Sequence, residues 1–390
     1  MSLIKSLLNR NTRETKEYRT YSPNTTYNIT LDSVPGQLLE IRPFQDNDGI
    51  DAGANLLQAL HDVRIRNGEN VSDAHAFEIW FDRGEFKFRL YAANDRASDR
   101  FKRRITNTYT NTEVTPRTSG QAIPKLRPSD HVAAARLSEE RHTFLPIRHH
   151  NAEGFQHGDP YSDIMGEMLT LDDSLAVVQV IFKPVPKDWT ENGPNGESVS
   201  DVAADLRSGS VVGFTDPLFW LGLRELEKRD STSKDKEAAK IVEQQRGEQG
   251  FHVNVRVLAA SPQPREARER ARGIASMFAK YYNATSEQGL DHHPVETSDD
   301  EMQRLLAQMS LRKQQDRGMI LSIDEVAGLA HVPNRDIEVP QIPWKSTQSG
   351  SQIPAEASKD EANTSDVATD QNAVSNAGWM NEAPTDDGGR

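Results

Sequence analysis

The sequence contains no cysteine among its 390 residues. Disulfide bonds, thiolate metal sites and cysteine nucleophiles are therefore excluded. No apolar run approaches the ~20 residues that a membrane-spanning helix needs, and the first residues do not have the pattern of a cleavable signal peptide. We expect residues 1–29 to be a flexible terminus. We also expect a cytoplasmic protein, and contact with the inner face of the membrane stays open.

Basic residues are outnumbered by acidic ones, 46 to 59. The formal net charge is −13, the mean hydropathy is −0.71, and arginine is about twice as frequent as lysine. This balance suits a protein kept soluble in high salt, because carboxylates hold hydration and few long lysine stems are exposed. A halophilic protein is the preferred interpretation, and an ordinary acidic protein is the alternative. The length is sufficient for two domains with tails.

The first unit is expected at residues 30–116. Two runs of period two, 77–81 and 86–90, flank Arg83-Gly84 and predict a hairpin. A strand at 38–44 and a helix precede this hairpin, and a second helix and an edge strand follow it. The helices should bury residues at helical spacing, namely Leu56, Leu57, Leu60, Val63, Ala97, Phe101, Ile105 and Tyr109. The order β-α-β-β-α-β predicts a ferredoxin-like unit in an α+β protein.

A second unit with the same order is expected at 143–318. Its elements are a strand at 144–150, a helix that begins at Asp159-Pro160, strands at 176–182 and 251–258, and a long helix at 264–283. The region between the two units, 117–142, is interpreted as a linker with one helical turn near 131–137. The chain is thus predicted to hold two tandem ferredoxin-like units.

An insertion at 186–249 occupies the place of the hairpin turn in the second unit. An insertion of this length in a hairpin is usually functional or disordered. Residues 215–226 are expected to form a capped helix, and 228–240 a charged, mobile stretch. Phe219 and Trp220 in that helix are the best candidates for contact with a partner or a membrane surface. Packing against their own domain is the alternative.

One group of side chains has the composition of a metal site: His149, His150, His157, Asp159 and Asp163. Adjacent histidines on a strand point to opposite faces, so they cannot both bind one ion without a bend. Solvated or capping side chains are the preferred interpretation. We therefore expect no metal, no cofactor and no catalytic residues.

The alternative function is a rolling-circle-type nicking endonuclease or a DNA-binding replication protein, because ferredoxin-like cores also host such proteins. That activity needs a His-hydrophobic-His pair for a metal and a tyrosine nucleophile on a helix. Tyr281 and Tyr282 lie on a suitable helix. However, His149-His150 lacks the intervening residue and His252 is alone on its strand.

Two predicted helices carry basic faces that could contact nucleic-acid phosphates. Arginines paired with nearby carboxylates in solvent are the preferred alternative. The residues are Arg100, Lys102, Arg103, Arg104, Arg265, Arg268 and Arg272.

The segment 319–344, MILSIDEVAGLAHVPNRDIEVPQIPW, predicts a helix with a capping box from Ser322 to Glu325. It resembles the L-S-x-x-E-[LV]-A-x-L-x-H-[LV]-P signature of archaeal conjugative type IV secretion and HerA–FtsK-like DNA-transfer ATPases. There the signature lies just before the nucleotide-binding domain. The matching positions here are Leu321, Ser322, Glu325, Val326, Ala327, Leu329, His331, Val332 and Pro333.

The phosphate-binding loop G-x-x-x-x-G-K-[ST] of that family occurs nowhere in the 390 residues. We therefore do not expect this chain to share the ATP hydrolysis of that family. The acidic, low-complexity residues 346–390 are expected to be disordered. The resemblance covers 30–345. It implies an accessory or assembly protein of a plasmid or virus that forms a homo-oligomer and acts with a separately encoded P-loop ATPase.

Under this hypothesis, residues 319–345 form a helix and docking segment, whereas contact with DNA, directly or through the partner, stays open. The expected docking residues are Leu321, Ser322, Glu325, Leu329, His331, Pro333, Trp344, Phe219 and Trp220.

Overall fold

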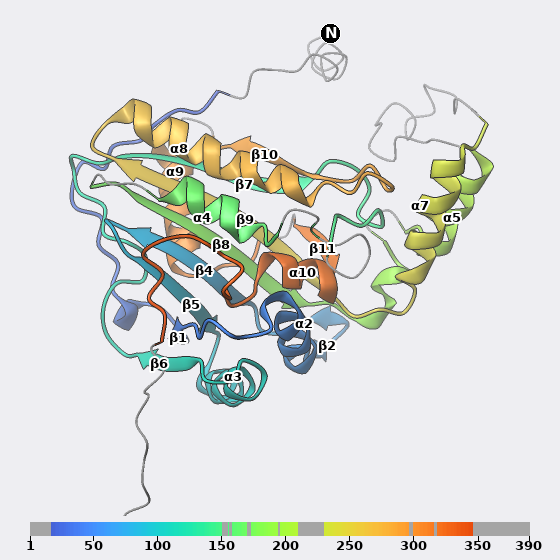
Figure 1. The fold of residues 1–390 in the computed structure, drawn as a ribbon, viewed down its shortest axis with the longest axis horizontal. Helices are drawn as coiled ribbons and strands as arrows, with labels where there is room; N and C mark the ends of the chain where they lie inside the picture. Colours follow the sequence, from blue (N-terminus) through green and yellow to red (C-terminus); the bar gives the residue numbers. More distant parts are fainter. Residues whose placement is uncertain are drawn as a thin grey trace, which may run out of the picture. The chain divides into compact units, whose positions relative to one another are not determined.

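The structure is a computed structural model. It describes residues 17–149, 155, 158–169, 173–193, 196–209, 230–295, 299–315 and 318–345, all of which belong to one compact unit spanning 1–346. The described residues hold eight α-helices and an antiparallel sheet of nine strands, so the fold class is α+β (Figure 1). The predicted tail, 346–390, lies outside the described residues.

The sheet runs in the order β10-β7-β9-β8-β4-β5-β1-β6, and β11 pairs with the start of β9. We call residues 37–117 the first half and residues 131–294 the second half; β4 and β8 join them. A separate hairpin is formed by β2 (Ile65–Arg66) and β3 (Glu69–Asn70). The strands of the large sheet are β1 (Gln37–Arg42), β4 (His75–Asp82), β5 (Phe86–Ala92), β6 (Glu113–Arg117), β7 (His131–Glu139), β8 (Leu175–Pro184), β9 (Gly250–Ser261), β10 (Leu290–Pro294) and β11 (Met319–Ser322).

Helices cover both faces of this sheet, so its central strands are buried on both sides. One face carries α2 (Gly49–Leu60), α3 (Asp95–Thr108), α4 (Tyr161–Met168), α8 (Pro264–Met277) and α10 (Ile323–Leu329). The opposite face carries α9 (Asp299–Ser310), which packs with Trp80, Val177 and Leu258. Short 3-10 helices lie at Leu31–Ser33, Lys187–Thr190 and Phe278–Tyr281.

The predicted β4–β5 hairpin is confirmed. Arg83 and Gly84 at its turn have φ values of 51° and 101°, both in the left-handed region that tight hairpin turns require. The inward positions of the following helix are also confirmed, since Ala97, Phe101 and Ile105 are buried against the sheet.

The prediction for residues 131–137 was wrong. These residues form β7 rather than a helical turn in a linker, and β7 pairs with both β9 and β10. Its Ala133 and Ala135 are buried in the same core as Ala267 and Ala271 of α8. Small side chains let the helix lie close to the strand, so an alanine-rich sequence suits this position. Conversely, the strand expected at 144–150 is absent from its described residues, 144–149.

The expected insertion lies between β8 and β9, and most of the stretch 228–240, which was expected to be mobile, is helical from Ser233 onward. Thr232 caps α7 (Ser233–Gln244) through a capping box with Asp235, and α5 (Val199–Ser208) packs beside it. Both helices share a small core with Phe144 and Trp189. Residues 210–229, with Phe219 and Trp220, lie outside the described residues.

The described part of the expected flexible terminus, 17–29, lies along the chain's own backbone. Tyr21 pairs with Val132 and Tyr27 with Leu126. Only residues 1–16 of that terminus remain outside the described range, so the prediction of flexibility was too broad.

A buried polar network lies where the two halves meet. Glu78 of β4 faces Gln179 of β8, and both side chains are fully buried. Arg312 donates to both carboxylate oxygens of Glu78, at 2.9 and 3.0 Å, and Gln179 donates to the same carboxylate at 2.7 Å. Arg256 of β9 in turn donates to Gln179 Oε1 at 3.1 Å. The network fixes the β4–β8 junction and the loop after α9.

Candidate functional site

Residues 319–345, which we call the clasp, connect the two halves of the sheet on one face. Its first strand, β11, pairs with β9 of the second half. Its helix, α10, packs against α2 of the first half. The remainder runs back along the first half, where Arg335 N–H donates to Gln45 O and Lys345 N–H donates to Pro43 O. The signature identified in the sequence therefore lies in an intramolecular bridge.

The predicted capping box at the start of α10 is confirmed. Ser322 donates to Glu325 Oε2 from both its amide and its hydroxyl, each at 2.8 Å. The other oxygen, Oε1, accepts the amide of Ile147 at 2.8 Å. Burial raises the pKa of Glu325 to about 7, although the hydrogen bonds from Ser322 and Ile147 oppose the shift. One glutamate thus caps the helix and fixes the 144–149 loop.

Side chains cap the other end of α10. The carbonyls of residues 327–329 have no partner within so short a helix. They accept instead from His331 Nδ1 at 2.9 Å, from the Tyr281 hydroxyl at 2.7 Å and from the Tyr161 hydroxyl at 2.8 Å. The two tyrosines come from the second half, so the end of α10 is anchored there.

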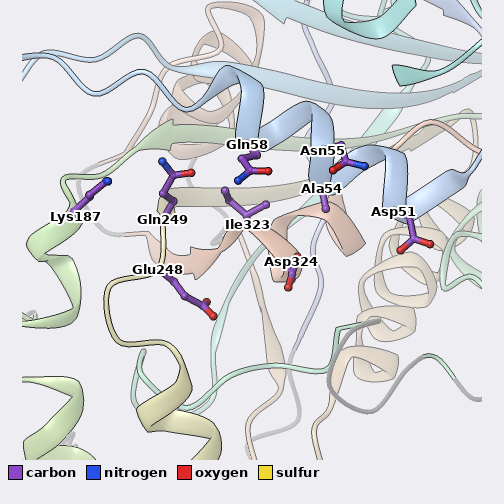
Figure 2. Close-up of a pocket in the computed structure, with 9 residues that line it drawn as sticks. All are labelled: Asp51, Ala54, Asn55, Gln58, Lys187, Glu248, Gln249, Ile323 and Asp324. Carbon is purple, nitrogen blue, oxygen red and sulfur yellow. The ribbon is translucent and has the colours of Figure 1, made fainter. Parts of the chain in front are cut away.

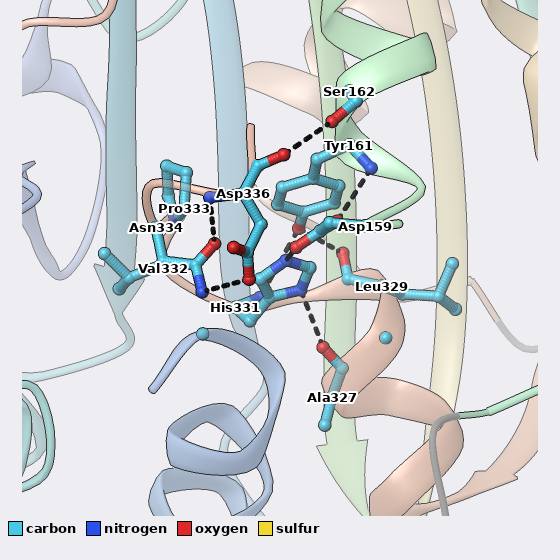
Figure 3. Close-up of polar contacts among 12 residues, drawn as sticks. Asp159, Tyr161, Ser162, Ala327, Leu329, His331, Val332, Pro333, Asn334 and Asp336 are labelled. Carbon is cyan, nitrogen blue, oxygen red and sulfur yellow. Dashed lines mark hydrogen bonds and ion pairs between the residues drawn. The ribbon is translucent and has the colours of Figure 1, made fainter. Parts of the chain in front are cut away.

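His331 is the centre of this arrangement (Figure 3). Its Nε2 lies 2.7 Å from Asp159 Oδ2, while its Nδ1 faces the carbonyl of Ala327. A carboxylate and a carbonyl both accept hydrogen bonds, so each ring nitrogen faces an acceptor, and the protonated ring forms a buried ion pair with Asp159. The ring stacks on Tyr161 with centroids 4.0 Å apart. Asp159 also accepts the Tyr161 amide at 2.8 Å. The N-cap of α4 is Pro160, one residue later than predicted, and it makes no side-chain capping hydrogen bond.

The first half holds the clasp through Tyr109 and Asn47. The Tyr109 hydroxyl donates to Gly49 O at 3.1 Å and accepts the Val332 amide at 3.2 Å. Asn47 donates to Pro333 O at 2.8 Å. At Gly53 of α2 an added Cβ would lie 2.9 Å from His331 Cβ, so glycine is needed where helix and clasp meet.

The burial of these residues corrects the docking hypothesis. Six predicted docking residues are buried within the chain, and Trp344 is half-buried against the same core. The side chains of these six residues, unlike that of Trp344, are wholly buried in contacts within the chain. The six are Leu321, Ser322, Glu325, Leu329, His331 and Pro333.

An open groove of about 510 Å³ lies beside the start of α10 (Figure 2). Three of its lining side chains are carboxylates, Asp51, Glu248 and Asp324, and one is an ammonium group, Lys187. Burial, and secondarily the charge of Asp324, raise the pKa of Glu248. The remaining lining residues are Ala54, Asn55, Gln58, Gln249 and Ile323. Sequence reasoning missed this groove because its residues come from four separate segments.

The model of one protein family, described as a domain of unknown function (DUF8128), matches residues 11–345. The chain belongs to this family. All the described residues, clasp included, lie within the DUF8128 match. No curated protein matches the chain.

The group with metal-site composition does not come together in the described part of the DUF8128 domain. Asp159 pairs with His331, and Asp163 forms an ion pair with Lys280. His150 and His157 lie outside the described residues. Among those described, no three His, Asp or Glu side chains are placed to hold a metal ion.

The tyrosines considered as nucleophiles differ in exposure. Tyr281 is buried, its hydroxyl is bonded to Gly328 O, and burial raises its pKa well above the ordinary value. The proposal that Tyr281 is a nucleophile was therefore wrong, because its buried hydroxyl cannot reach a substrate. Tyr282 is 40% exposed.

The two basic helices of the DUF8128 domain are only partly neutralised. Arg100 pairs with Asp62, Lys102 with Asp99 and Arg265 with Glu269. The side chains of Arg103, Arg104 and Arg272 are exposed, and Arg268 is half-buried. Separately, no helix in the described ranges is both long and apolar enough to cross a bilayer.

Proposed function

We propose that this DUF8128 protein is a non-catalytic accessory and assembly protein of a DNA-transfer system, which acts with a separately encoded P-loop ATPase. The proposal rests on the contacts that the residues of the signature make in the structure. Each polar side chain of the 321–333 match is bonded within the chain, and its apolar side chains pack in the core. A resemblance located in such residues supports a shared scaffold and not a shared reaction.

We further propose that each half is a ferredoxin-like unit. In the first half the strands lie in the order β4-β5-β1-β6, and in the second in the order β8-β9-β7-β10. Both orders are second, third, first and fourth along the chain, with two helices on one face. The insertion 186–249 then lies between the second and third strands of the second unit. The boundaries 30–116, 117–142 and 143–318 move accordingly, since β7 starts the second unit at His131.

Docking to the motor is proposed at the outer side of the clasp. Arg335 has 73% of its side chain exposed there, in an ion pair with Asp46, and Trp344 is half-buried nearby in sequence. Self-association and contact with a membrane surface stay predictions.

Co-purification tests the proposal directly. The tagged full-length protein should retain the P-loop ATPase from the neighbouring reading frame in molar salt. The change R335E with W344A should weaken retention, whereas the control R246E, which makes the same charge change in another exposed ion pair, with Glu191, should not. Unchanged thermal melting would establish that the variants are folded.

Two results would overturn this function. One is a failure to associate with the ATPase at molar salt, and the other is nucleotide turnover by the purified protein alone. Cleavage of labelled single-stranded DNA with Mg²⁺ or Mn²⁺ would instead favour the nicking endonuclease.

A further inference from the structure

Helix α3 concentrates positive charge in an acidic protein. Its 14 residues carry five cations, Arg96, Arg100, Lys102, Arg103 and Arg104, against two anions, Asp95 and Asp99. The chain as a whole has a net charge of −13. Ala97, Phe101 and Ile105 bury the opposite side of the helix. The cations are thus held on the solvent side by packing of the apolar side.

The ion pairs around α3 leave an excess of cations. Arg100 is matched by Asp62 at 3.1 Å, and Lys102 by Asp99 at 3.8 Å. Within the described residues, Arg96, Arg103 and Arg104 are exposed and form no ion pair. Arginine suits phosphate because its planar fork presents several donors and is weakly hydrated.

The chain beyond α3 adds uncharged donors to this surface. Residues 110–120 are mostly exposed and include Thr110, Asn111, Thr115, Thr118 and Ser119, with one carboxylate, Glu113, that pairs with Arg42 at 4.0 Å. Hydroxyl and amide side chains of this kind commonly donate to nucleic-acid phosphates. The same stretch forms the edge strand β6, whose Pro116 lacks an amide hydrogen. A partner strand therefore cannot pair regularly with this edge, so charge is the better basis for recognition.

We propose that the outer face of α3, together with residues 110–119, binds the phosphate backbone of DNA. This inference deepens the proposed function, on which it rests for the choice of DNA among polyanions. Residues 96–104 extend roughly 12 Å along the helix, at 1.5 Å per residue. A DNA strand presents a phosphate about every 3.4 Å along the duplex axis, so the face spans three to four phosphates.

Helix α8, the other basic helix, is a weaker candidate. Arg265 is paired with Glu269, and Arg270 donates to the carbonyl of Met168. Glu266 lies on the same helix and accepts from Ser261. Four arginines against two glutamates leave α8 less basic than α3. The contact is therefore assigned to α3 alone.

Fluorescence polarisation with a labelled 30-base-pair duplex tests the proposal, using purified full-length protein without the motor. Binding is measured from 0.2 to 1 M KCl, and circular dichroism establishes that the protein is folded at each concentration. The variant R103E/R104E should bind about tenfold more weakly than the native sequence. A plot of the log of its affinity against log salt concentration should be shallower, with a slope smaller in magnitude by about 1.8, as expected for the loss of two phosphate contacts.

The charge-matched control is R207E/R246E, which alters two exposed arginines near α5 and α7 and should change affinity less than twofold. An equal loss in both variants would mean that only net charge matters and would overturn the inference. Absence of DNA binding by the native protein at 0.2 M would do the same. Displacement of DNA by polyglutamate at equal charge concentration would also overturn it, since the surface would then recognise any polyanion. None of these results depends on whether the ATPase co-purifies.

Discussion

Replacing Asp159 with asparagine should cost far less stability than replacing the His331 that it contacts with leucine. In the native protein the Tyr161 amide lies 2.8 Å from Asp159 Oδ1, and in D159N the asparagine oxygen can still accept this hydrogen bond. The asparagine NH₂ can donate to Nε2 of a neutral imidazole, and Nδ1–H can still donate to Ala327 O. All three hydrogen bonds are preserved while both charges disappear.

The leucine substitution has a different result. H331L removes both ring hydrogen bonds and leaves the carboxylate of Asp159, a residue only 8% exposed, without its counter-charge. Removing one partner of a buried ion pair typically costs about 3–5 kcal/mol, whereas neutralising both partners is often close to neutral. We therefore expect a loss of about 3–5 kcal/mol for H331L and below about 1.5 kcal/mol for D159N.

Urea unfolding at constant salt and pH, followed by circular dichroism, measures both losses. The double variant D159N/H331L should be more stable than H331L, because the asparagine removes the unpaired charge. H293L is the control, since the side chain of His293 is 56% exposed and should change stability little. The reasoning is refuted if D159N loses as much stability as H331L, or if H331L loses less than about 1 kcal/mol.

Two further predictions concern other contacts of the clasp. Because burial raises the folded-state pKa of Glu325 to about 7, from an ordinary value of 4.5, its contribution to stability is greatest below pH 4.5 and falls as the pH rises to 7. As the pH rises over that window, the native protein should lose up to about 3 kcal/mol of unfolding free energy relative to E325Q. An unchanged difference between the two proteins from pH 5 to pH 7 would contradict this. His75, whose burial lowers its pKa to about 4, gives the opposite slope in both proteins and so cancels in the difference. At the α2 contact, G53V should lose about 1–3 kcal/mol by overpacking against His331. The control G166A, in α4 with open space around the added methyl group, should gain up to about 1 kcal/mol in thermal or urea unfolding. Equal effects of the two changes would argue against close packing at Gly53.

Much of the fold follows from local patterns. The β4–β5 hairpin, the central strands β8 and β9, and the buried sides of α3 and α8 were all predicted correctly. In each of these elements the apolar period and the turn residues agree with the structure. β7 was missed because its three consecutive alanines, Ala133 to Ala135, favour a helix locally. In the structure Ala133 and Ala135 pack in the core that α8 covers, and Ala134 packs in the core with α9 on the opposite face.

The polar network and the clasp were harder to predict. Along β4, Glu78 and Trp80 alternate with Phe77 and Ile79 and so lie on the opposite face, which α9 and the loop after it cover. The presence of Trp80 on that face was the available signal that it is buried. The capping box of α10 could be predicted because it is local. The His331–Asp159 pair could not, since its partners are 172 positions apart in sequence.

The junction between β4 and β8 has a consequence for synthesis on the ribosome. β4 is complete at Asp82, but its partner does not begin until Leu175. At roughly 5–20 residues per second, translation leaves that border of the nascent sheet without its neighbour for about 5–20 s. During this interval Phe77, Ile79 and Phe81 lie on an open strand, where another nascent chain could pair. Chaperone protection early in translation should therefore matter more for this protein than for one whose neighbouring strands follow each other directly.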